Sequence, residues 1–397
     1  MFCLHLPAKQ TIHCISAINP KTKLIDSMDF RTKVKQPVLL FQLAVAAAVS
    51  TACGSATGSR DNTINIAADA SARLGLADVT EVIGFTTICS PDSCLIEHVT
   101  KAVRIPGGYA LLNHSKEHPV VAYSDSGKFM CSFGRIGNGP GEYTYVEDIA
   151  LSPRGDSLLV STWTSEVYSY ALDGTFGRSV IVDDSIGFCK VATNSNGIAL
   201  FSPNLVEGFN SLSLYSPQGK KKFSGLPSSG HFSYPFFCRL PIDKEFVYAL
   251  DWYENILYQI TTSGDSVSNS WTINMPNGVA SRNFPDINAF LNNDSEVDYI
   301  IDWSVANGRF VAVCFYDKIP RYIEYDLERN EMVRQGSYVN CLPDFTPAGD
   351  DGYFITIIRD DNYKWIEESL PEGVELPPFD SEATDAILML WRLKTKE

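Results

Sequence analysis

The chain has 397 residues, of which 45% are hydrophobic and 12% aromatic. This composition is sufficient for the core of one large domain or two medium ones, and it argues against a disordered chain. The net charge is −15, and because residues 1–52 hold six Lys or Arg and two Asp or Glu, the remainder carries 26 minus 45, or −19. Such a surface repels phosphate backbones and anionic head groups. We therefore expect no nucleic-acid partner, and membrane attachment only through a lipid anchor.

Residues 1–52 have the three-part order of a signal peptide. Basic residues at positions 31, 33 and 35 precede an apolar run at 38–49, and small residues follow it. The apolar run is shorter than the roughly 20 residues that a permanent membrane-spanning helix needs, so we expect it to be cleaved. Residues 1–27 add nothing to such a signal, and Met28 is a natural start for it.

Cys53 follows two small residues, Thr51 and Ala52, in an order that resembles a bacterial lipobox, although Ser50 stands where leucine is usual. We expect a lipid anchor at Cys53, and the alternative is an ordinary signal peptide that is cut near Ala52. Residues 53–77 are then expected to form a flexible tether. No acidic cluster follows the cysteine, so the side of the outer membrane that the protein faces stays open.

Of the ten cysteines, seven remain when Cys3, Cys14 and Cys53 are set aside. Only Cys89 and Cys94 are close in sequence, so in an exported protein we expect these two to form a disulfide. The others lie in strand-like runs, where we expect buried free thiols. The chain has no Cys-x-x-Cys pair and thus no zinc or redox motif, and we expect no metal and no cofactor.

Glycine turns recur along the chain with a period of about 45 residues. Four of them are spaced by 47, 45 and 45 residues, and an alternating strand with an aromatic residue precedes each one: Gly127, Gly174, Gly219 and Gly264. Similar strands occur at 321–326 and 386–391, which gives six copies. A repeat of this length built from short strands is typical of a β-propeller.

The sixth copy has no hairpin partner after it, whereas residues 79–88 form an extra strand ahead of the first copy. An open ring would expose an unpaired strand edge. We therefore predict an all-β, six-bladed β-propeller over residues 78–397, with four-stranded antiparallel blades and an N-terminal strand that completes the last one. The predicted blades are 95–136, 146–182, 188–226, 236–273, 297–338 and 342–394 with 79–88. A β-sandwich or two smaller all-β domains would be the alternative, but no linker-like segment divides the chain.

The loop after the first blade contains four glycines and a proline between positions 134 and 141, so it must be a structured turn. Its sequence, Gly137-Asn138-Gly139-Pro140-Gly141-Glu142-Tyr143, resembles the loop between the first two blades of six-bladed β-propeller lipoproteins of Gram-negative bacteria, which are relatives of NHL-repeat propellers. The resemblance implies a scaffold in the cell envelope, but it implies no activity.

In such a propeller, the loops between blades and the loops after each second strand lie on one face, where ligands usually bind. Insertions at 274–298 and 360–384 break the period, and both fall on that face. Aromatic, amide and carboxylate side chains suit a glycan or an extended peptide. The candidate ligand-binding residues are Glu142, Tyr143, Trp163, Asp251, Trp252, Tyr253, Tyr316, Arg359 and Trp365.

Several of these features also have structural explanations. The glycine-rich loop lacks the strand-loop-helix setting of a nucleotide site. His114 and His118 flank a turn rather than lying on a helix, so we expect surface residues and not a metal pair. Asp148 is expected to bond loop amides, although it could line the channel instead. Trp163 and Trp252 could equally pack between blades.

The mature chain contains no Gly-x-Ser-x-Gly, His-Glu-x-x-His or Ser-x-x-Lys motif. We therefore expect a monomeric outer-membrane lipoprotein that binds a glycan, a peptide or an envelope protein on the loop-rich face without catalysis. One alternative is a propeller hydrolase or lyase that acts on a glycan or a small polar substrate at the same face. The other is a structural scaffold of an envelope complex.

Overall fold

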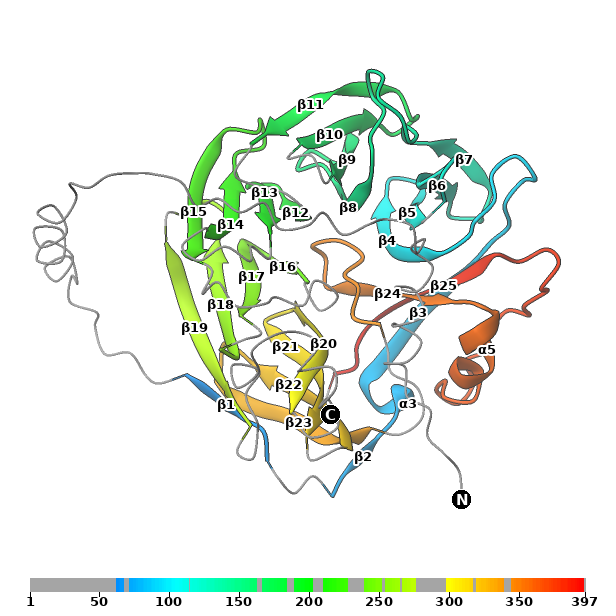
Figure 1. Ribbon diagram of the computed structural model, residues 1–397. Helices are drawn as coiled ribbons and strands as arrows, with labels where there is room; N and C mark the ends of the chain where they lie inside the picture. Colours follow the sequence, from blue (N-terminus) through cyan, green and yellow to red (C-terminus); the bar gives the residue numbers. More distant parts are fainter. Residues whose placement is uncertain are drawn as a thin grey trace, which may run out of the picture. The chain divides into compact units, whose positions relative to one another are not determined.

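The chain divides into two units, 1–59 and 60–397, and the second contains all the residues that the computed structural model describes. Those residues are 62–67, 71–113, 115–162, 166–183, 189–202, 210–227, 239–251, 254–264, 266–275, 298–316, 319–338 and 344–395. They form six β-sheets around a central axis (Figure 1). The second unit is therefore an all-β six-bladed propeller, as the sequence repeat predicted. None of the described helices is long and apolar enough to cross a membrane.

Blades one to three each consist of four antiparallel strands, which follow one another in chain order from the axis outward. Blade one contains β4 (Val99–Ile105), β5 (Gly108–Asn113), β6 (Val120–Ser124) and β7 (Phe129–Ser132). Blade two contains β8 (Val146–Leu151), β9 (Ser157–Thr162), β10 (Glu166–Ala171) and β11 (Phe176–Val182). Blade three contains β12 (Lys190–Asn194), β13 (Gly197–Phe201), β14 (Asn210–Tyr215) and β15 (Lys221–Pro227).

Blades four and five carry a fifth, outermost strand from the N-terminal segment. Blade four contains β16 (Ile242–Asp243), β17 (Phe246–Asp251), β18 (Ile256–Thr261) and β19 (Val267–Asn274), and β1 (Thr63–Asn65) pairs with β19 in parallel. Blade five contains β20 (Tyr299–Ala306), β21 (Arg309–Tyr316), β22 (Ile319–Asp326) and β23 (Glu331–Tyr338), and β2 (Arg73–Leu74) pairs with β23 in parallel. The outer edges of these two blades are thereby covered.

Blade six combines both ends of the propeller chain. Its strands are β24 (Tyr353–Ile358), β25 (Ala386–Leu393) and β3 (Thr80–Ile88), and β3 pairs with β25 over its whole length, with Val82 opposite Trp391. On the axis side, residues 346–348 are bonded to β24 through two backbone hydrogen bonds, which provides a short inner edge. Two helices accompany this blade, α3 (Leu76–Val79) and α5 (Asp360–Glu367). From β4 to β25, no strand extends more than one residue beyond the predicted blade limits.

The described part of the expected tether, 62–67 and 71–77, belongs to the propeller instead. Ile64 and Ile66 are almost completely buried in the core between blades four and five, and Leu76 is buried beside blade six. Burial of each such side chain contributes about 1.5–3 kcal/mol, which outweighs the polar composition of the preceding residues. The prediction of a free tether up to residue 77 was therefore wrong for this segment.

A buried ion pair joins blade five to both ends of the propeller chain. The carboxylate of Glu324 is fully buried, and its Oε2 atom lies 2.9 Å from Nε of Arg334. The two Nη groups of Arg334 donate hydrogen bonds to the carbonyl oxygens of Asp78, at 2.5 Å, and Lys394, at 2.7 Å. Asp78 lies in α3 just before β3, and Lys394 follows β25, so one arginine holds both strands that close the ring.

The predicted disulfide is not formed, because Cys89 and Cys94 are both free thiols. Cys89 is exposed and forms an isolated β-bridge with Lys128, whereas Cys94 is buried in the core between blades six and one. The turn between them thus directs the two side chains to different environments. Cys189 and Cys314 are buried free thiols, as expected, and burial raises the pKa of each to about 12.

Candidate ligand-binding site at the propeller axis

The six inner strands and the segments next to them bring charged side chains together around the axis. We call this set the axial charge ring: Lys101, Glu147, Asp148, Lys190, Arg239, Asp302 and Asp344. Each blade contributes at least one member. Hydrogen bonds and ion pairs connect them in two groups, Lys101 and Lys190 with Asp148 and Glu147, and Arg239 with Asp302 and Asp344, so side chains up to 105 positions apart in sequence bond directly.

A β-bulge recurs at the start of three inner strands. The register shifts between Val99 and Lys101 in β4, and the same shift occurs at the equivalent place in β8 and in β20. A bulge adds one residue to a strand and re-aims the side chains next to it. In each of the three blades, the residue that follows the bulge belongs to the axial charge ring: Lys101, Asp148 and Asp302.

On the side of blades one to three, two lysines are paired with two carboxylates of β8. Lys101 donates to Asp148 at 2.8 Å, and Lys190 donates to Glu147 at 2.7 Å. Asp148 also accepts the backbone N–H of Val191 at 3.0 Å, so it both lies at the axis and bonds an amide of the next blade. Burial lowers the pKa of Lys101, and the attraction of Asp148 only partly opposes this effect.

On the opposite side, Arg239 is bound by two carboxylates. Its Nε and Nη2 atoms donate to Asp302 at 2.9 and 3.1 Å in a bidentate pair, and Nη2 also donates to Asp344 at 2.9 Å. Such forked pairs fix both position and orientation. Burial raises the pKa of Asp302, and the nearby Asp344 adds to this shift, whereas Arg239 opposes it.

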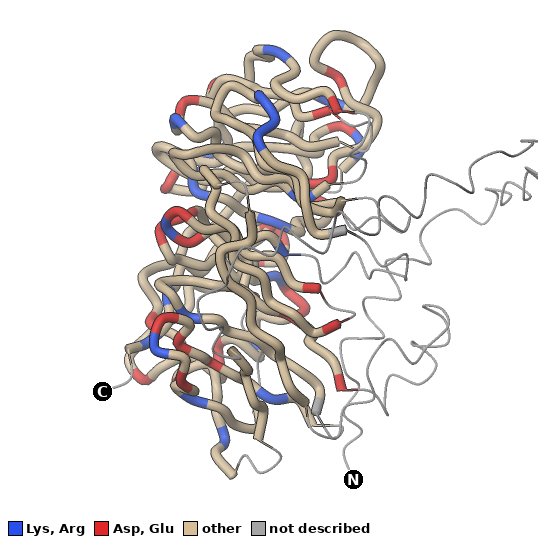
Figure 2. Tube along the Cα trace, turned by 90° about the vertical axis from the view of Figure 1, so that its left-hand side faces the viewer, with Lys and Arg blue, Asp and Glu red and all other residues tan. Residues whose placement is uncertain are grey.

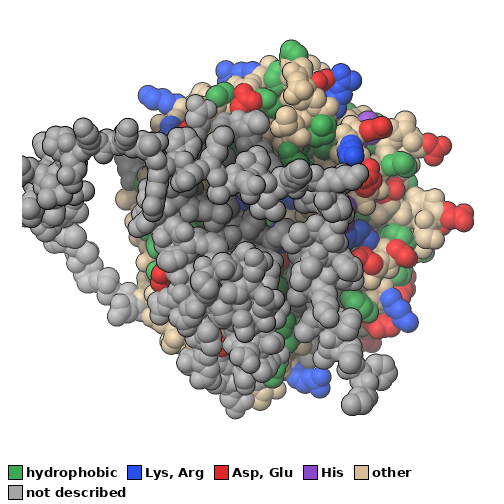
Figure 3. All heavy atoms as spheres, in the orientation of Figure 1, with side chains coloured by type: hydrophobic (Ala, Val, Ile, Leu, Met, Phe, Trp, Pro, Cys, Tyr) green, Lys and Arg blue, Asp and Glu red, His purple; other side chains and the backbone are tan. Residues whose placement is uncertain are grey.

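A cavity of about 280 Å³ opens between blades six and one. The residues that line it come from the start of β4, the end of β24, helix α5 and the axial charge ring: His98, Val99, Thr100, Asp344, Thr356, Ile357, Arg359, Asn362 and Ile366. Since first strands begin and second strands end on this side, the cavity lies on the face predicted to carry the ligand-binding loops. Figure 3 shows charged side chains of both signs gathered on the right-hand part of this face, and Figure 2 shows acidic residues at strand ends along one face of the disc.

Arg359 is the predicted site residue that the structure places in the cavity. Its Nη1 atom donates to Nδ1 of His98 at 2.9 Å, so that ring nitrogen must be the acceptor and carries no proton. Its backbone N–H donates to Oδ1 of Asn362 at 2.7 Å, which fixes the start of α5. The guanidinium group is thereby held at the junction of two blades, with 32% of the side chain exposed.

Two predicted site residues are structural. Tyr143 is only 2% exposed, and its hydroxyl donates to the carbonyl of Phe133 at 2.5 Å. Glu142 accepts the backbone N–H of Gly139 at 2.8 Å and the Nε–H of Arg135 at 2.6 Å, so its carboxylate closes its own loop. These contacts, led by the Gly139 amide, lower the pKa of Glu142. The prediction that this pair contacts a ligand was therefore wrong for Tyr143, which the core between blades one and two buries.

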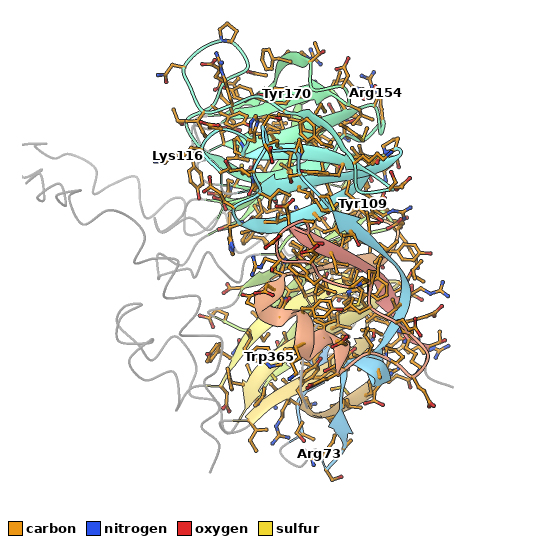
Figure 4. The ribbon with its side chains drawn as sticks, turned by 90° about the vertical axis from the view of Figure 1, so that its right-hand side faces the viewer. Arg73, Tyr109, Lys116, Arg154, Tyr170 and Trp365 are labelled. Atoms are coloured by element: carbon orange, nitrogen blue, oxygen red, sulfur yellow. The ribbon has the colours of Figure 1, made fainter. Side chains whose placement is uncertain are left out.

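The other predicted site residues are not brought together among the described residues. Trp365 is 58% exposed on α5 (Figure 4) and does not line the cavity. Asp251 ends β17 and accepts the backbone N–H of Glu254 at 2.9 Å, as a turn-capping residue does. Tyr316 belongs to β21, but its side chain lies outside the described residues. Cys53, Trp163, Trp252 and Tyr253 also lie outside them, as does His114.

Sequence reasoning missed most of the axial charge ring. Among its seven members, the sequence indicated only Asp148 as a possible axial residue. One signal was present, because Lys101 and Asp148 are spaced by 47 residues, which is the repeat period. The inward direction of the side chains depends on the bulges, which no periodicity shows. Within the described residues, no cluster of three or more His, Cys, Asp or Glu is arranged to hold a metal ion.

Fold and site together define a six-bladed β-propeller with a charged axis and a small polar cavity on its loop face. Residues 61–383 match the family described as "Domain of unknown function (DUF4934)", and the chain belongs to this family. No curated protein matches the sequence.

Three solved structures match parts or most of the chain. A protein of Bacteroides fragilis NCTC 9343, titled "Putative exported protein", superposes with a TM-score of 0.61 at 16% identity, over 84% of this chain and 99% of that one. BamB from Moraxella catarrhalis gives a TM-score of 0.41 at 10% identity over 65% and 68% of the two chains. The computationally designed Ika8 protein gives 0.38 at 8% identity over 62% and 77%. Only the first of these three TM-scores is high enough to support the fold. With identities of 8–16%, none of the three comparisons bears on activity.

Proposed function

We propose that this protein is an exported, lipid-anchored binding protein that holds a glycan, a peptide or a protein partner on its loop face without catalysis. The observation that supports this proposal most directly is the cavity of about 280 Å³ between blades six and one, next to the axial charge ring. Its volume is close to the lower end of the roughly 300–1,000 Å³ typical of small-molecule sites. A small ligand, or the end of a longer one, suits it best.

The state of the charged groups favours binding over catalysis. Each cation of the axial charge ring lies 2.7–2.9 Å from a carboxylate. Ion-paired groups of this kind stay charged and keep their position. A general acid or base, in contrast, must exchange a proton with the substrate. The ring therefore suits electrostatic recognition by a rigid surface.

Export and anchoring rest on the N-terminal segment and on one structural relative. The order of residues 1–52, the small residues before Cys53 and the similar protein titled "Putative exported protein" all support passage across the inner membrane. Since β1 runs parallel to the outermost strand of its blade, Thr63 lies on the face opposite the cavity. The first described strand thus begins away from the proposed site.

Two experiments test this function. The purified protein is applied to glycan and peptide arrays, and hydrogen exchange with a bound hit should show protection at 98–100 and 357–366. An absence of hits, or protection confined to other residues, would contradict the proposed site. Metabolic labelling with an alkyne fatty acid should modify the wild-type protein but not the Cys53→Ala variant. The variant should also be absent from the membrane fraction. Equal labelling of the wild type and the variant would contradict the lipid anchor.

A hydrolase is the second candidate, and one observation favours it. Asp302 and Asp344 share Arg239, and burial raises the pKa of Asp302. Glycoside hydrolases use a pair of neighbouring carboxyl groups. Mass spectrometry of array hits after incubation with the protein separates the candidates: new products that Asp302→Asn no longer forms would establish the enzyme, and intact ligands support the binding protein.

A further inference from the structure

The cavity presents one unused hydrogen-bonding group of each charge. On Asp344, all three hydrogen bonds that the described residues provide go to Oδ1: from Nη2 of Arg239, and from the amide and the hydroxyl of Thr346. None of the described residues donates to its Oδ2. On Arg359, Nη1 and Nε face His98, Val99 and Asp361, whereas Nη2 has no acceptor in the described part of the chain.

Both groups are reachable from solvent, because the side chains of Asp344 and Arg359 are each 32% exposed. A carboxylate oxygen and a guanidinium NH₂ group to which no described residue is bonded therefore line the same small cavity. A ligand that supplies only one charge, or none, would remove water from one of these groups without replacing its hydrogen bonds. That loss costs about 1–3 kcal/mol for each group, and more when the group is charged.

The remaining lining narrows the ligand class further. Val99, Ile357 and Ile366 form apolar parts of the wall, which favour a ligand with an aliphatic portion. Among the described residues that line the cavity there is no Trp, Tyr or Phe. The aromatic surface on which a sugar ring would stack is thus missing from this wall, although such stacking is the usual source of affinity for neutral glycans.

We infer that this cavity binds a small zwitterion with an aliphatic side chain, namely a free amino acid or a dipeptide, whose carboxylate pairs with Arg359 and whose ammonium group pairs with Asp344. The inference rests on the proposed binding function and names the ligand class of the same site. It selects the peptide-like ligands from the wider set of glycans, peptides and proteins. Both charges must be present in one molecule for full affinity.

Isothermal titration calorimetry with L-leucine, L-leucyl-L-leucine and blocked forms of the dipeptide tests the inference. We expect the zwitterions to bind, and we expect N-acetylation or C-amidation of the dipeptide to weaken binding at least about tenfold each, because each removes one charge pair. Cellobiose, a neutral sugar of similar size, should not bind. Equal affinity for the free and the doubly blocked dipeptide would overturn the inference, and so would the absence of binding by both zwitterions.

Two variants assign each charge to its partner. Arg359→Gln should lower the affinity for the free dipeptide about tenfold and leave the affinity for the C-amidated form unchanged. Asp344→Asn should lower the affinity for the free dipeptide about tenfold and leave the affinity for the N-acetylated form unchanged. Arg104→Gln is the matched control, since Arg104 lies at the other end of β4 in an exposed pair with Asp351. Wild-type affinity in Arg359→Gln and Asp344→Asn, with circular dichroism showing folded protein, would refute the assignment.

The failure of this inference can be told apart from the failure of the proposed function. If an array hit such as a blocked peptide or a neutral glycan binds, and Arg359→Gln does not change its affinity, the binding function stands and the zwitterion site is wrong. If neither the arrays nor the zwitterions give binding, both proposals fall.

Discussion

Replacement of Arg334 by alanine should weaken the junction at which the propeller ring closes. The side chain is only 13% exposed, and it connects the buried carboxylate of Glu324 with the backbones of α3 and of the residue after β25. Its loss leaves Glu324 with Arg309 as the remaining cation, at 2.5 Å. It also leaves the carbonyl oxygens of Asp78 and Lys394 without this donor.

The expected cost follows from the burial of the pair. Removal of one partner from a buried ion pair costs about 3–5 kcal/mol, because the other charge stays in a poorly solvated place. In a domain of this size, 1 kcal/mol changes Tm by about 1.5 °C. Arg334→Ala should therefore melt about 4–7 °C below the wild type.

Thermal unfolding followed by circular dichroism measures the change, and Arg329→Ala is the control. Arg329 lies in the same blade but is 75% exposed, and its carboxylate neighbours are 3.8–3.9 Å away. Exposed pairs contribute about 0–1 kcal/mol, so this variant should melt close to the wild type. If both variants melt at the same temperature, the buried pair does not hold the ring.

Three further changes give distinct expectations. Gly127→Ala adds a Cβ atom 1.8 Å from a carbonyl oxygen of β3, whereas the Cβ atom of Gly107→Ala, at a similar positive φ, meets no atom within 4 Å. Gly107→Ala should therefore cost only the about 1–2 kcal/mol of left-handed backbone strain. Unfolding by guanidinium chloride should show a larger loss of stability for Gly127→Ala than for Gly107→Ala. The folded-state pKa of Glu142 lies below its ordinary value of 4.5, so its contribution is present above pH 4.5 and is lost as the pH falls through the lowered pKa; the acid limb of a Tm-against-pH curve should be shallower for Glu142→Gln than for the wild type. Trp365→Ala removes an exposed side chain of α5, so Tm should stay within about 1 °C of the wild type, while the affinity for an array hit should fall.

The sequence determined the number of blades and the segment of the chain that forms each one. Turn glycines at a period of about 45 residues require short strands of nearly constant length, and Gly127, Gly174 and Gly219 have the positive φ values that tight turns demand. Local chain geometry was sufficient for this, because a turn depends on the residues within it. The pairing of β3 with β25 also followed from a local fact, a sixth copy that lacked its last strand.

Only the tertiary structure decided which residues face the axis and which form a site. Arg239 and Asp344 are 105 positions apart, and no spacing in the sequence indicates that their side chains meet. The direction of Lys101, Asp148 and Asp302 depends on bulges, which are set by pairing with the next strand. Closure of the ring determines which distant residues meet, because it places the starts of six strands that are far apart in the sequence around one axis.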